Sequence, residues 1–459
     1  MADAQRGRSP WVGAALSACL LLTAAAASAQ SGGEVEFSRG VGFAQAPGQS
    51  PRILGKGLPL KEGDRLTTSE NALAIIKLED GTRMTVRPNS ELVLQQYRFK
   101  ENAPDNSMLM QLVRGGFRAV TGLISKNAPN AAKVQTRTAT IGIRGTDFDA
   151  RLCARDCGVE SSRVIATARP NAVMASAKVV TSQGELYAID ASNQRRRLVD
   201  GGPVYPGDMV ETLAGTRAVL AFRDNSRVTL GPSTKFRIDN FVYDENNAGE
   251  GRFLVSLLRG SVRALTGLIG KANHSNVGFT TATATIGVRG TGVDLVCTGA
   301  CAGEAGDADS GLTVWDWLGS VIVTPNGMTA LEALQEGQGL FISSSGIQLI
   351  TNQPTIDGPR PDGVDVPSNL FSGAPVSDSE EGLFVYVRNG HIELLTASQI
   401  LHLGQGEAGF AGNDGETRRP ITIPKFLDFD RLPLPTSRNP AAVILFSESG
   451  IPPNNTCPR

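Results

Sequence analysis

The sequence is poor in the residues that most catalytic and metal sites need. Only three of its 459 residues are histidine, and aromatic residues make up 5%. The histidines, His274, His391 and His402, have no metal-ligand partner at a useful spacing. A G-x-S-x-G nucleophile motif and a phosphate-binding P-loop are also missing. We therefore predict no catalytic residue, no cofactor and no metal site, although an unmarked pair of carboxylates could still serve a glycosidase.

Net charge is also nearly absent. The chain carries 44 basic and 45 acidic residues, for a formal charge of −1. Such a balance provides no long-range field to gather nucleic acid or an anionic membrane. The local cluster Arg195-Arg196-Arg197 is interpreted as a solvated hairpin end. We expect no nucleic-acid partner.

Long apolar runs are confined to the N-terminus. Arg6 and Arg8 precede an apolar stretch, and Ala27-Ser28-Ala29 fits the small-x-small rule for signal peptidase. We predict a signal peptide over 1–29 and a periplasmic or secreted protein. Two alternatives stay open, namely a retained anchor and a lipoprotein modified at Cys19 within Leu16-Ser17-Ala18-Cys19. No other stretch is apolar enough to cross a membrane.

What the chain does contain is a long internal repeat. TATIGIRGT at Thr138–Thr146 returns as TATIGVRGT at Thr283–Thr291. Upstream, the segments Arg114–Lys126 and Arg259–Lys271 also match each other. The spacing is far longer than the 20–50 residues of a solenoid repeat. It indicates a duplicated domain, which agrees with a length that allows roughly two to four domains.

The repeated pieces read as β structure. Apolar residues alternate on both sides of Asp80-Gly81 and, in the second copy, of Asp224-Asn225. This pattern predicts a half-buried antiparallel hairpin in each copy. Abundant glycine, 52 residues in all, favours tight turns. We predict an all-β fold with two tandem antiparallel modules, sandwich- or roll-like, and a smaller C-terminal β-hairpin unit.

The expected organisation follows from these patterns. A hairpin over Ala177–Ile189 is interpreted as the extension of the first copy, matching Leu312–Thr324 in the second. Asn389-Gly390 is interpreted as a hairpin turn between two short strands. We expect the following boundaries: a signal peptide over 1–29, a first module over 34–157, a second module over 175–301, a β-hairpin extension over 310–350, a linker over 351–381, a C-terminal β unit over 382–418 and a Pro-rich tail over 419–459.

Five cysteines follow the signal segment. Cys153 and Cys157 form one C-x3-C pair, and Cys297 and Cys301 form the other, each just after a repeated RGT. In an oxidising compartment we predict a small disulfide-closed loop in each module. A zinc half-site and a redox site are alternatives. Cys457 is either a free thiol or paired with another molecule.

The repeated motif Arg144-Gly145-Thr146 and Arg289-Gly290-Thr291 has two interpretations. Its glycines suggest a β-bulge or a close backbone approach. Its arginines could bind a carboxylate or phosphate of a ligand, or pair with an internal acid such as Asp147, Asp149 or Asp294. We favour a structural role. His391 and Glu393 would share one strand face, which we interpret as an exposed cross-hairpin pair.

The order of these pieces resembles the FecR-like periplasmic domain. That family shows a Gly-Asp start, a D-G hairpin, a Leu-x-x-Gly-x-Val/Phe-Arg turn and an Ile-x-Val-Arg-Gly-Thr ending. The matching residues are Gly63-Asp64, Asp80-Gly81, Arg114–Arg118 and Thr138–Thr146 in the first copy, and Gly207-Asp208, Asp224-Asn225, Arg259–Arg263 and Thr283–Thr291 in the second.

The resemblance implies an extracytoplasmic β module that takes part in signalling. In the protein that gives this family its name, a membrane helix joins the domain to a cytoplasmic anti-sigma segment. Only ten residues precede the apolar segment here, so we expect no such anti-sigma region. We expect a non-enzymatic binding or sensing module that engages a protein or envelope component. A structural or assembly protein of the envelope and an envelope enzyme are the alternatives.

Overall fold

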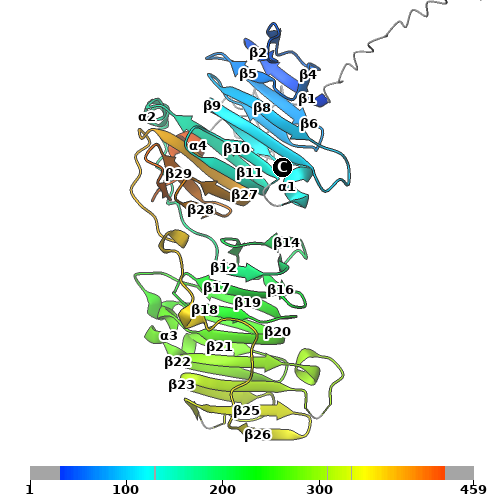
Figure 1. Ribbon diagram of the computed structural model, residues 1–459. Helices are drawn as coiled ribbons and strands as arrows, with labels where there is room; N and C mark the ends of the chain where they lie inside the picture. Colours follow the sequence, from blue (N-terminus) through cyan, green and yellow to red (C-terminus); the bar gives the residue numbers. More distant parts are fainter. Residues whose placement is uncertain (1–30, 129–130, 308, 332, 429–459) are drawn as a thin grey trace, which may run out of the picture.

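The computed structural model describes residues 31–128, 131–307, 309–331 and 333–428. The expected signal peptide, Cys19 and Cys457 lie outside these ranges. Within them the strands form two sheets of 15 strands each, stacked end to end as two units (Figure 1). The prediction of an all-β fold is confirmed. None of the helices in the described part is both long and apolar enough to span a membrane.

The first unit combines residues 31–162 with residues 382–428. Its strands are β1 (Ser31–Arg39), β2 (Gly42–Gln45), β3 (Arg52–Ile53), β4 (Pro59–Lys61), β5 (Arg65–Thr68), β6 (Leu73–Leu78), β7 (Arg83–Val86), β8 (Glu91–Arg98), β9 (Ser107–Val120), β10 (Ala132–Gln135), β11 (Thr140–Cys153), β27 (Gly382–Leu395), β28 (Ile400–Leu403), β29 (Ala408–Gly412) and β30 (Thr417–Arg418). Its short helices are α1 (Leu123–Asn127), α2 (Cys157–Ser162) and α4 (Lys425–Asp428).

The second unit is continuous and spans residues 177–350. Its strands are β12 (Ala177–Gln183), β13 (Leu186–Ile189), β14 (Arg195–Leu198), β15 (Pro203–Val204), β16 (Met209–Thr212), β17 (Arg217–Phe222), β18 (Arg227–Leu230), β19 (Lys235–Val242), β20 (Arg252–Leu265), β21 (Val277–Thr280), β22 (Ala284–Cys297), β23 (Leu312–Pro325), β24 (Leu334–Gln335), β25 (Gln338–Ser343) and β26 (Gly346–Ile350). It also holds α3 (Leu268–Ala272) and the 3-10 turns η1 (Ala248–Glu250), η2 (His274–Asn276) and η3 (Gly299–Ala302), while η4 (Pro361–Gly363) and η5 (Ser368–Leu370) lie in the segment between the two sheets.

The C-terminal strands, expected to form a smaller unit of their own, belong to the first sheet. β27 pairs antiparallel with β11 along its length, with Ile143 opposite Ile392. β23 pairs with β22 in the same way in the second unit. The second unit is thus inserted into the first. β11 would otherwise present an unpaired edge, and β27 satisfies its backbone groups.

The hairpin over Ala177–Ile189 is also placed differently from the expectation. β12 begins the second unit and pairs with β17, as β1 pairs with β6 in the first unit. The true counterpart of β23 is therefore β27, which follows about 230 residues after β11 in the chain. The predicted hairpins around Asp80-Gly81 and Asp224-Asn225 are present as β6–β7 and β17–β18.

Six strands of 14 residues each bend at a glycine. β9, β11 and β27 do so in the first unit, and β20, β22 and β23 in the second. The glycines have positive φ: Gly115 (74°), Gly145 (65°), Gly390 (91°), Gly260 (87°), Gly290 (65°) and Gly319 (95°). A side chain is strained in this conformation. Gly390 is therefore a corner within one strand and not the expected hairpin turn.

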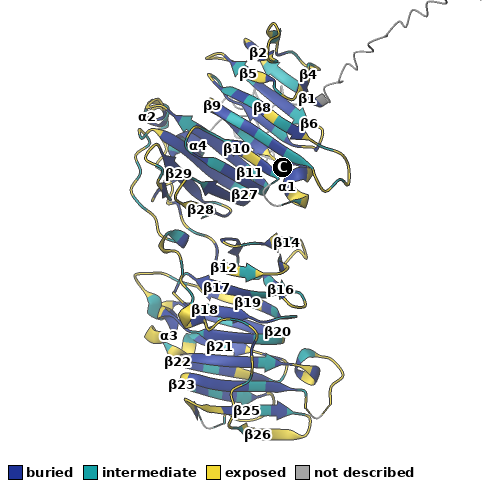
Figure 2. Cartoon of the chain, viewed as in Figure 1, coloured by how far each residue is buried: buried dark blue, intermediate teal, exposed yellow. Residues whose placement is uncertain are grey.

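Each bend moves its strand from one layer of the sheet to the other. The first half of β9 pairs with β8 and β10, whereas its second half pairs with β7 and β11. Strands that change layers at bulges make the corners of packed sheets. The core of the first unit lies between the layers and includes Leu383, Val385 and Ile392 from β27, all 0% exposed. The dark strands of Figure 2 follow this core.

Candidate binding groove between the two units

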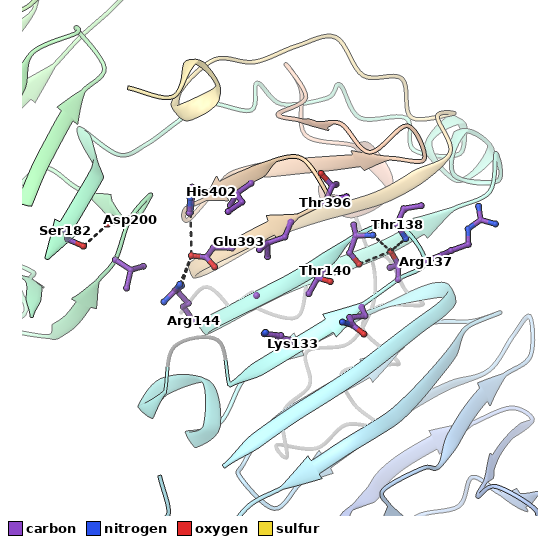
Figure 3. A pocket seen from close by; sticks show the side chains of 18 residues that line it. Lys133, Arg137, Thr138, Thr140, Arg144, Ser182, Asp200, Glu393, Thr396 and His402 are labelled. Atoms are coloured by element: carbon purple, nitrogen blue, oxygen red, sulfur yellow. Dashed lines mark hydrogen bonds and ion pairs between the residues drawn. The ribbon is translucent and has the colours of Figure 1, made fainter. Parts of the chain in front are cut away.

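A groove opens on the outer face of the first unit where the second unit begins (Figure 3). Its volume is about 970 Å³. Three basic side chains, two acidic side chains and several hydroxyl groups line it. The lining residues are Lys133, Gln135, Thr136, Arg137, Thr138, Ala139, Thr140, Gly142, Arg144, Glu393, Leu395, Thr396, Ala397, Ile400 and His402 from the first unit, and Ser182, Val199 and Asp200 from the second.

The period of the β-strand explains why these residues face the groove. On β11, Ile141 and Ile143 point into the core and are at most 1% exposed. Thr140 and Arg144 alternate with them and therefore lie on the opposite face of the sheet. The same alternation puts Glu393 of β27 beside Arg144, because β11 and β27 are direct neighbours. The repeated TATIG-x-RGT segment forms the floor of the groove in the first unit.

An ion pair lies at the end of the groove that is nearest the second unit. Arg144 Nη2 donates to Glu393 Oε1 at 2.6 Å, and Arg144 Nε donates to the same oxygen at 3.2 Å. The side chains are 14% and 11% exposed. His402 Nδ1 lies 3.9 Å from the same oxygen. Figure 3 shows these three side chains pointing toward one another.

Arg144 therefore does not pair with the acids that the sequence suggested. Asp147 pairs with Arg118 at 3.0 Å, and Asp149 pairs with Arg388 at 2.6 Å. In the second unit Asp294 pairs with Arg263 at 2.8 Å. The actual partner, Glu393, comes from a strand 249 residues away in the chain. Local spacing could not reveal it.

The pair His391 and Glu393 is buried rather than exposed. His391 is 7% exposed and Glu393 is 8% exposed. The rings of His391 and His402 lie 5.6 Å apart. Burial lowers the pKa of His391 well below its usual value, and it lowers the pKa of His402 to about 4. Nearby cations, Lys178 and Arg144 among them, contribute to both shifts, and both rings are neutral at pH 7.

A buried charge cluster joins the two units behind the groove. Lys178 on β12 of the second unit donates to Glu407 Oε2 of the first unit at 3.0 Å, and to the His402 carbonyl at 3.1 Å. Arg419 Nε donates to the same Glu407 oxygen at 3.0 Å. Lys178 is 0% exposed, and the side chains of Glu407 and Arg419 are 1% exposed.

Burial sets the charge balance of this cluster. Desolvation lowers the pKa of Lys178 to about 8, against the raising effect of Glu407. The pKa of Glu407 is lowered although its burial alone would raise it, because Lys178 and Arg419 favour the carboxylate. Lys178 and Arg419 both donate to Oε2 of Glu407. The other carboxylate oxygen, Oε1, accepts no hydrogen bond from the described residues. Nothing in the sequence had marked these three residues.

A second cavity lies on the other side of Arg144. Its volume is about 520 Å³. The first unit contributes Arg144, Gly145 and His391, and the second unit contributes Arg196 and Tyr205, among others. Arg196 forms an ion pair with Asp208. The amide of Gln405 donates to the Tyr205 hydroxyl at 2.9 Å, which is another contact between the units. The first RGT motif thus lies between two cavities.

The three residues of the first motif have separate tasks. Gly145 is part of a β-bulge, because the register of β11 against β27 shifts between Arg144 and Asp147. Thr146 is 4% exposed, its amide donates to Thr121 Oγ1 at 2.7 Å, and its hydroxyl donates to the His391 carbonyl at 3.4 Å. Glycine and threonine therefore hold the corner, and the arginine faces the groove.

The second motif has a different environment. The same register shift occurs between Arg289 and Gly292. Ser320 lies opposite Arg289, where His391 lies opposite Arg144. Arg289 is exposed and has no ion pair with any residue that the structure describes. The side chain of Thr291 lies outside the described part. The two copies share the corner but not the groove.

Both expected cysteine loops contain a disulfide. Cys153 bonds to Cys157 with a Cα–Cα distance of 5.6 Å, and Cys297 bonds to Cys301 with a distance of 5.2 Å. The first bond ties the end of β11 to α2, within a small apolar cluster that includes Phe384. Cys153, Asp156 and Cys157 are close enough to share a metal, but both sulfurs are in the disulfide.

The comparisons with known proteins agree with the repeat. The family profile described as FecR protein matches residues 64–169 and residues 208–314, so the chain carries two tandem FecR domains. No curated protein matches the chain.

Two crystal structures of one protein of Parabacteroides distasonis, titled as a predicted anti-sigma factor, resemble part of the chain. Each has 17% identity and a TM-score of 0.24, and the match covers 31% of this chain. The chain spans 59% of that protein's length. A likeness at this level supports no statement about function.

Proposed function

We propose that this tandem FecR-domain chain is an exported, non-enzymatic sensing module of the bacterial envelope. Its groove binds a protein or an envelope component, and binding is sensed through the contact between the two units. The observation that carries the proposal is the composition of the groove. Residues of both units line it, so an occupant touches both at once.

The chemistry of the groove suits a polar occupant with acidic groups. Lys133, Arg137 and Arg144 provide cationic donors, and threonine hydroxyls lie between them. Arg144 already holds Glu393, and an incoming carboxylate would compete for the guanidinium. Such an exchange would disturb His402, which lies beside Glu393 and whose carbonyl accepts from Lys178 of the second unit. Occupancy is thereby coupled to the packing of the units.

A binding role fits the groups in the groove better than catalysis. Glu393 is held in an ion pair with Arg144. His402 has a pKa lowered to about 4, so it is not suited to exchange protons at neutral pH. The two disulfides support export, since such bonds persist in oxidising compartments. Export is tested by fractionation with thiol labelling, and free thiols at Cys297 and Cys301 in the envelope fraction would contradict it.

Photo-crosslinking from inside the groove tests the binding role. A benzophenone side chain replaces the exposed Arg137, and the matched control places it at Ala282, the exposed counterpart in the second copy. We expect a discrete adduct from position 137 in intact cells and none from position 282. A Thr140→Trp substitution, which fills the groove, should abolish the adduct without changing the melting temperature. Equal adducts from both positions, or an adduct that survives Thr140→Trp, would refute the proposal.

A further inference from the structure

The last strand of the second unit presents an open edge. β26 pairs with β25 on one side, and no strand of the described residues pairs with its other side. Four of its five residues are exposed. The chain then leaves across the face of the unit, where Gln353 donates to Asp294 and the carbonyl of Val364 accepts from Arg227. Unpaired edges of this kind are templates for pairing with another chain.

The other sheet ends are short, charged or covered. β3 has two residues. β14 carries Arg195, Arg196 and Arg197, of which the first two form ion pairs. β30 also has two residues, and the chain after it forms isolated bridges with Ala374 and Pro170. These are the usual ways in which proteins block edge-to-edge association. β26 is the exception among these four ends, and it is the end farthest from the first unit (Figure 1).

At this edge the apolar side chains that continue the core of the second unit are exposed to solvent. Leu349 lies opposite Leu340, and Ile347 lies opposite Ile342. Leu340 and Ile342 belong to the buried core and are 5% and 6% exposed. Directly opposite residues share a face of the sheet, so Leu349 and Ile347 continue the core side. They are nevertheless 77% and 36% exposed.

We propose that β26 docks against β26 of a second copy of this chain, antiparallel and centred on Gln348. In that register Ile347 lies opposite Leu349 of the second copy, and the reverse pair forms by symmetry. The four apolar side chains then share the core face, and the two Gln348 side chains meet on the other face. The strand is therefore complementary to itself, as a two-fold interface requires. The near-zero net charge of the chain offers no general repulsion between copies.

The size of the contact sets the expected strength. Two five-residue strands bury less than the ~1,200 Å² that marks the lower limit of standard interfaces. The dimer should therefore be weak, with a dissociation constant on the order of 10 μM. This inference is independent of the groove, which lies at the other end of the second unit. Loss of one would leave the other intact.

Sedimentation velocity of the purified chain, from about 1 to about 100 μM, tests the dimer. We expect a concentration-dependent shift from monomer to dimer. Leu349→Lys should shift the dissociation constant at least tenfold without altering the melting temperature, because this side chain is exposed. The matched control is Ile53→Lys, which changes an equally exposed residue, 73%, at the opposite end of the molecule. A chain that stays monomeric throughout, or a dimer unaffected by Leu349→Lys, would overturn the proposal.

The register has its own test. Gln348→Cys in a Cys457→Ser background should form a disulfide between copies on mild oxidation, because opposite Cα atoms in an antiparallel pair lie about 4.5–5.5 Å apart. Peptide mapping should find a 348–348 bond. The same experiment with Ser345→Cys, which lies outside the strand, should give at least tenfold less cross-linking. Equal cross-linking from both positions would show that copies associate in some other way.

Discussion

The buried cluster between the units predicts an unequal response to removing its members. Glu407→Gln leaves two buried cations, Lys178 and Arg419, without a carboxylate. Removing one partner of a buried ion pair typically costs about 3–5 kcal/mol. Lys178 can escape part of this cost by losing its proton. Its pKa is already lowered to about 8, so discharge at pH 7 limits its share to about 1 kcal/mol. Arg419 cannot discharge.

We therefore expect Glu407→Gln to destabilise the contact between the units by about 3 kcal/mol. Lys178→Met should cost less than about 1 kcal/mol, because Glu407 keeps Arg419 and a desolvated ammonium is replaced by an apolar chain of similar length. Combining Glu407→Gln with Lys178→Met should restore the part of the lost free energy that comes from the unpaired Lys178 ammonium. A double-mutant cycle separates these contributions.

Urea denaturation combined with hydrogen exchange measures the effect where it occurs. Trp315 and Trp317 both lie on β23, so tryptophan fluorescence follows the second unit. Amide exchange in β12 and β28 reports the contact between the units. Faster exchange in these strands is expected for Glu407→Gln, with little change for Lys178→Met. If Lys178→Met costs as much as Glu407→Gln, the reasoning from desolvation is wrong.

Three further predictions concern pH, the strand corners and the disulfides. His402 has a folded-state pKa of about 4 against an ordinary value of 6.5, so its stabilising effect is complete above pH 6.5 and is lost as the pH falls toward 4. Between pH 7 and pH 4.5, His402→Gln should therefore lose about 2 kcal/mol less unfolding free energy than the unsubstituted protein, and equal losses in denaturant unfolding curves of both proteins would contradict this. Gly145→Ala should lower the free energy of unfolding by about 1–2 kcal/mol because φ is 65°, and Gly145→Asn should lower it less, since asparagine tolerates this conformation; thermal melts that rank them otherwise would refute the corner argument. Replacing Cys297 and Cys301 by serine should cost about 2 kcal/mol in denaturant unfolding, as expected for so short a loop, and no change would mean that the disulfide is not formed.

The sequence could predict structure wherever the determinants are local. The hairpins around Asp80-Gly81 and Asp224-Asn225 follow from alternation and turn residues within about ten positions. Alternation shows that a segment is a strand with one buried face, but it does not name the neighbour. The pairing of Ile143 with Ile392 is therefore invisible without the tertiary fold. The dipeptide Asn389-Gly390 suits a strand corner as well as a hairpin turn, because both need a residue with a positive φ. The sequence therefore cannot distinguish the two structures.

The groove shows the same limit more sharply. The RGT motif can be identified from its repetition, and a glycine inside a strand predicts the bulge that the register shift at Gly145 shows. The buried charge cluster cannot be identified from the sequence. Lys178 stands between the core residues Ala177 and Val179, and alternation places it on the outer face of its strand. That outer face is covered by the first unit, which only the assembled molecule reveals. Arg419 begins the segment that we expected to be a Pro-rich tail, and it is 2% exposed.

The insertion of one unit within the other imposes an order on synthesis. A chain synthesised from its N-terminus produces β11 long before β27, and the whole second unit is made between them. The continuous second unit can complete its sheet first, while the earlier unit waits with the edge of β11 unpaired. The first unit is then completed late, in a single event in which β27 pairs with β11.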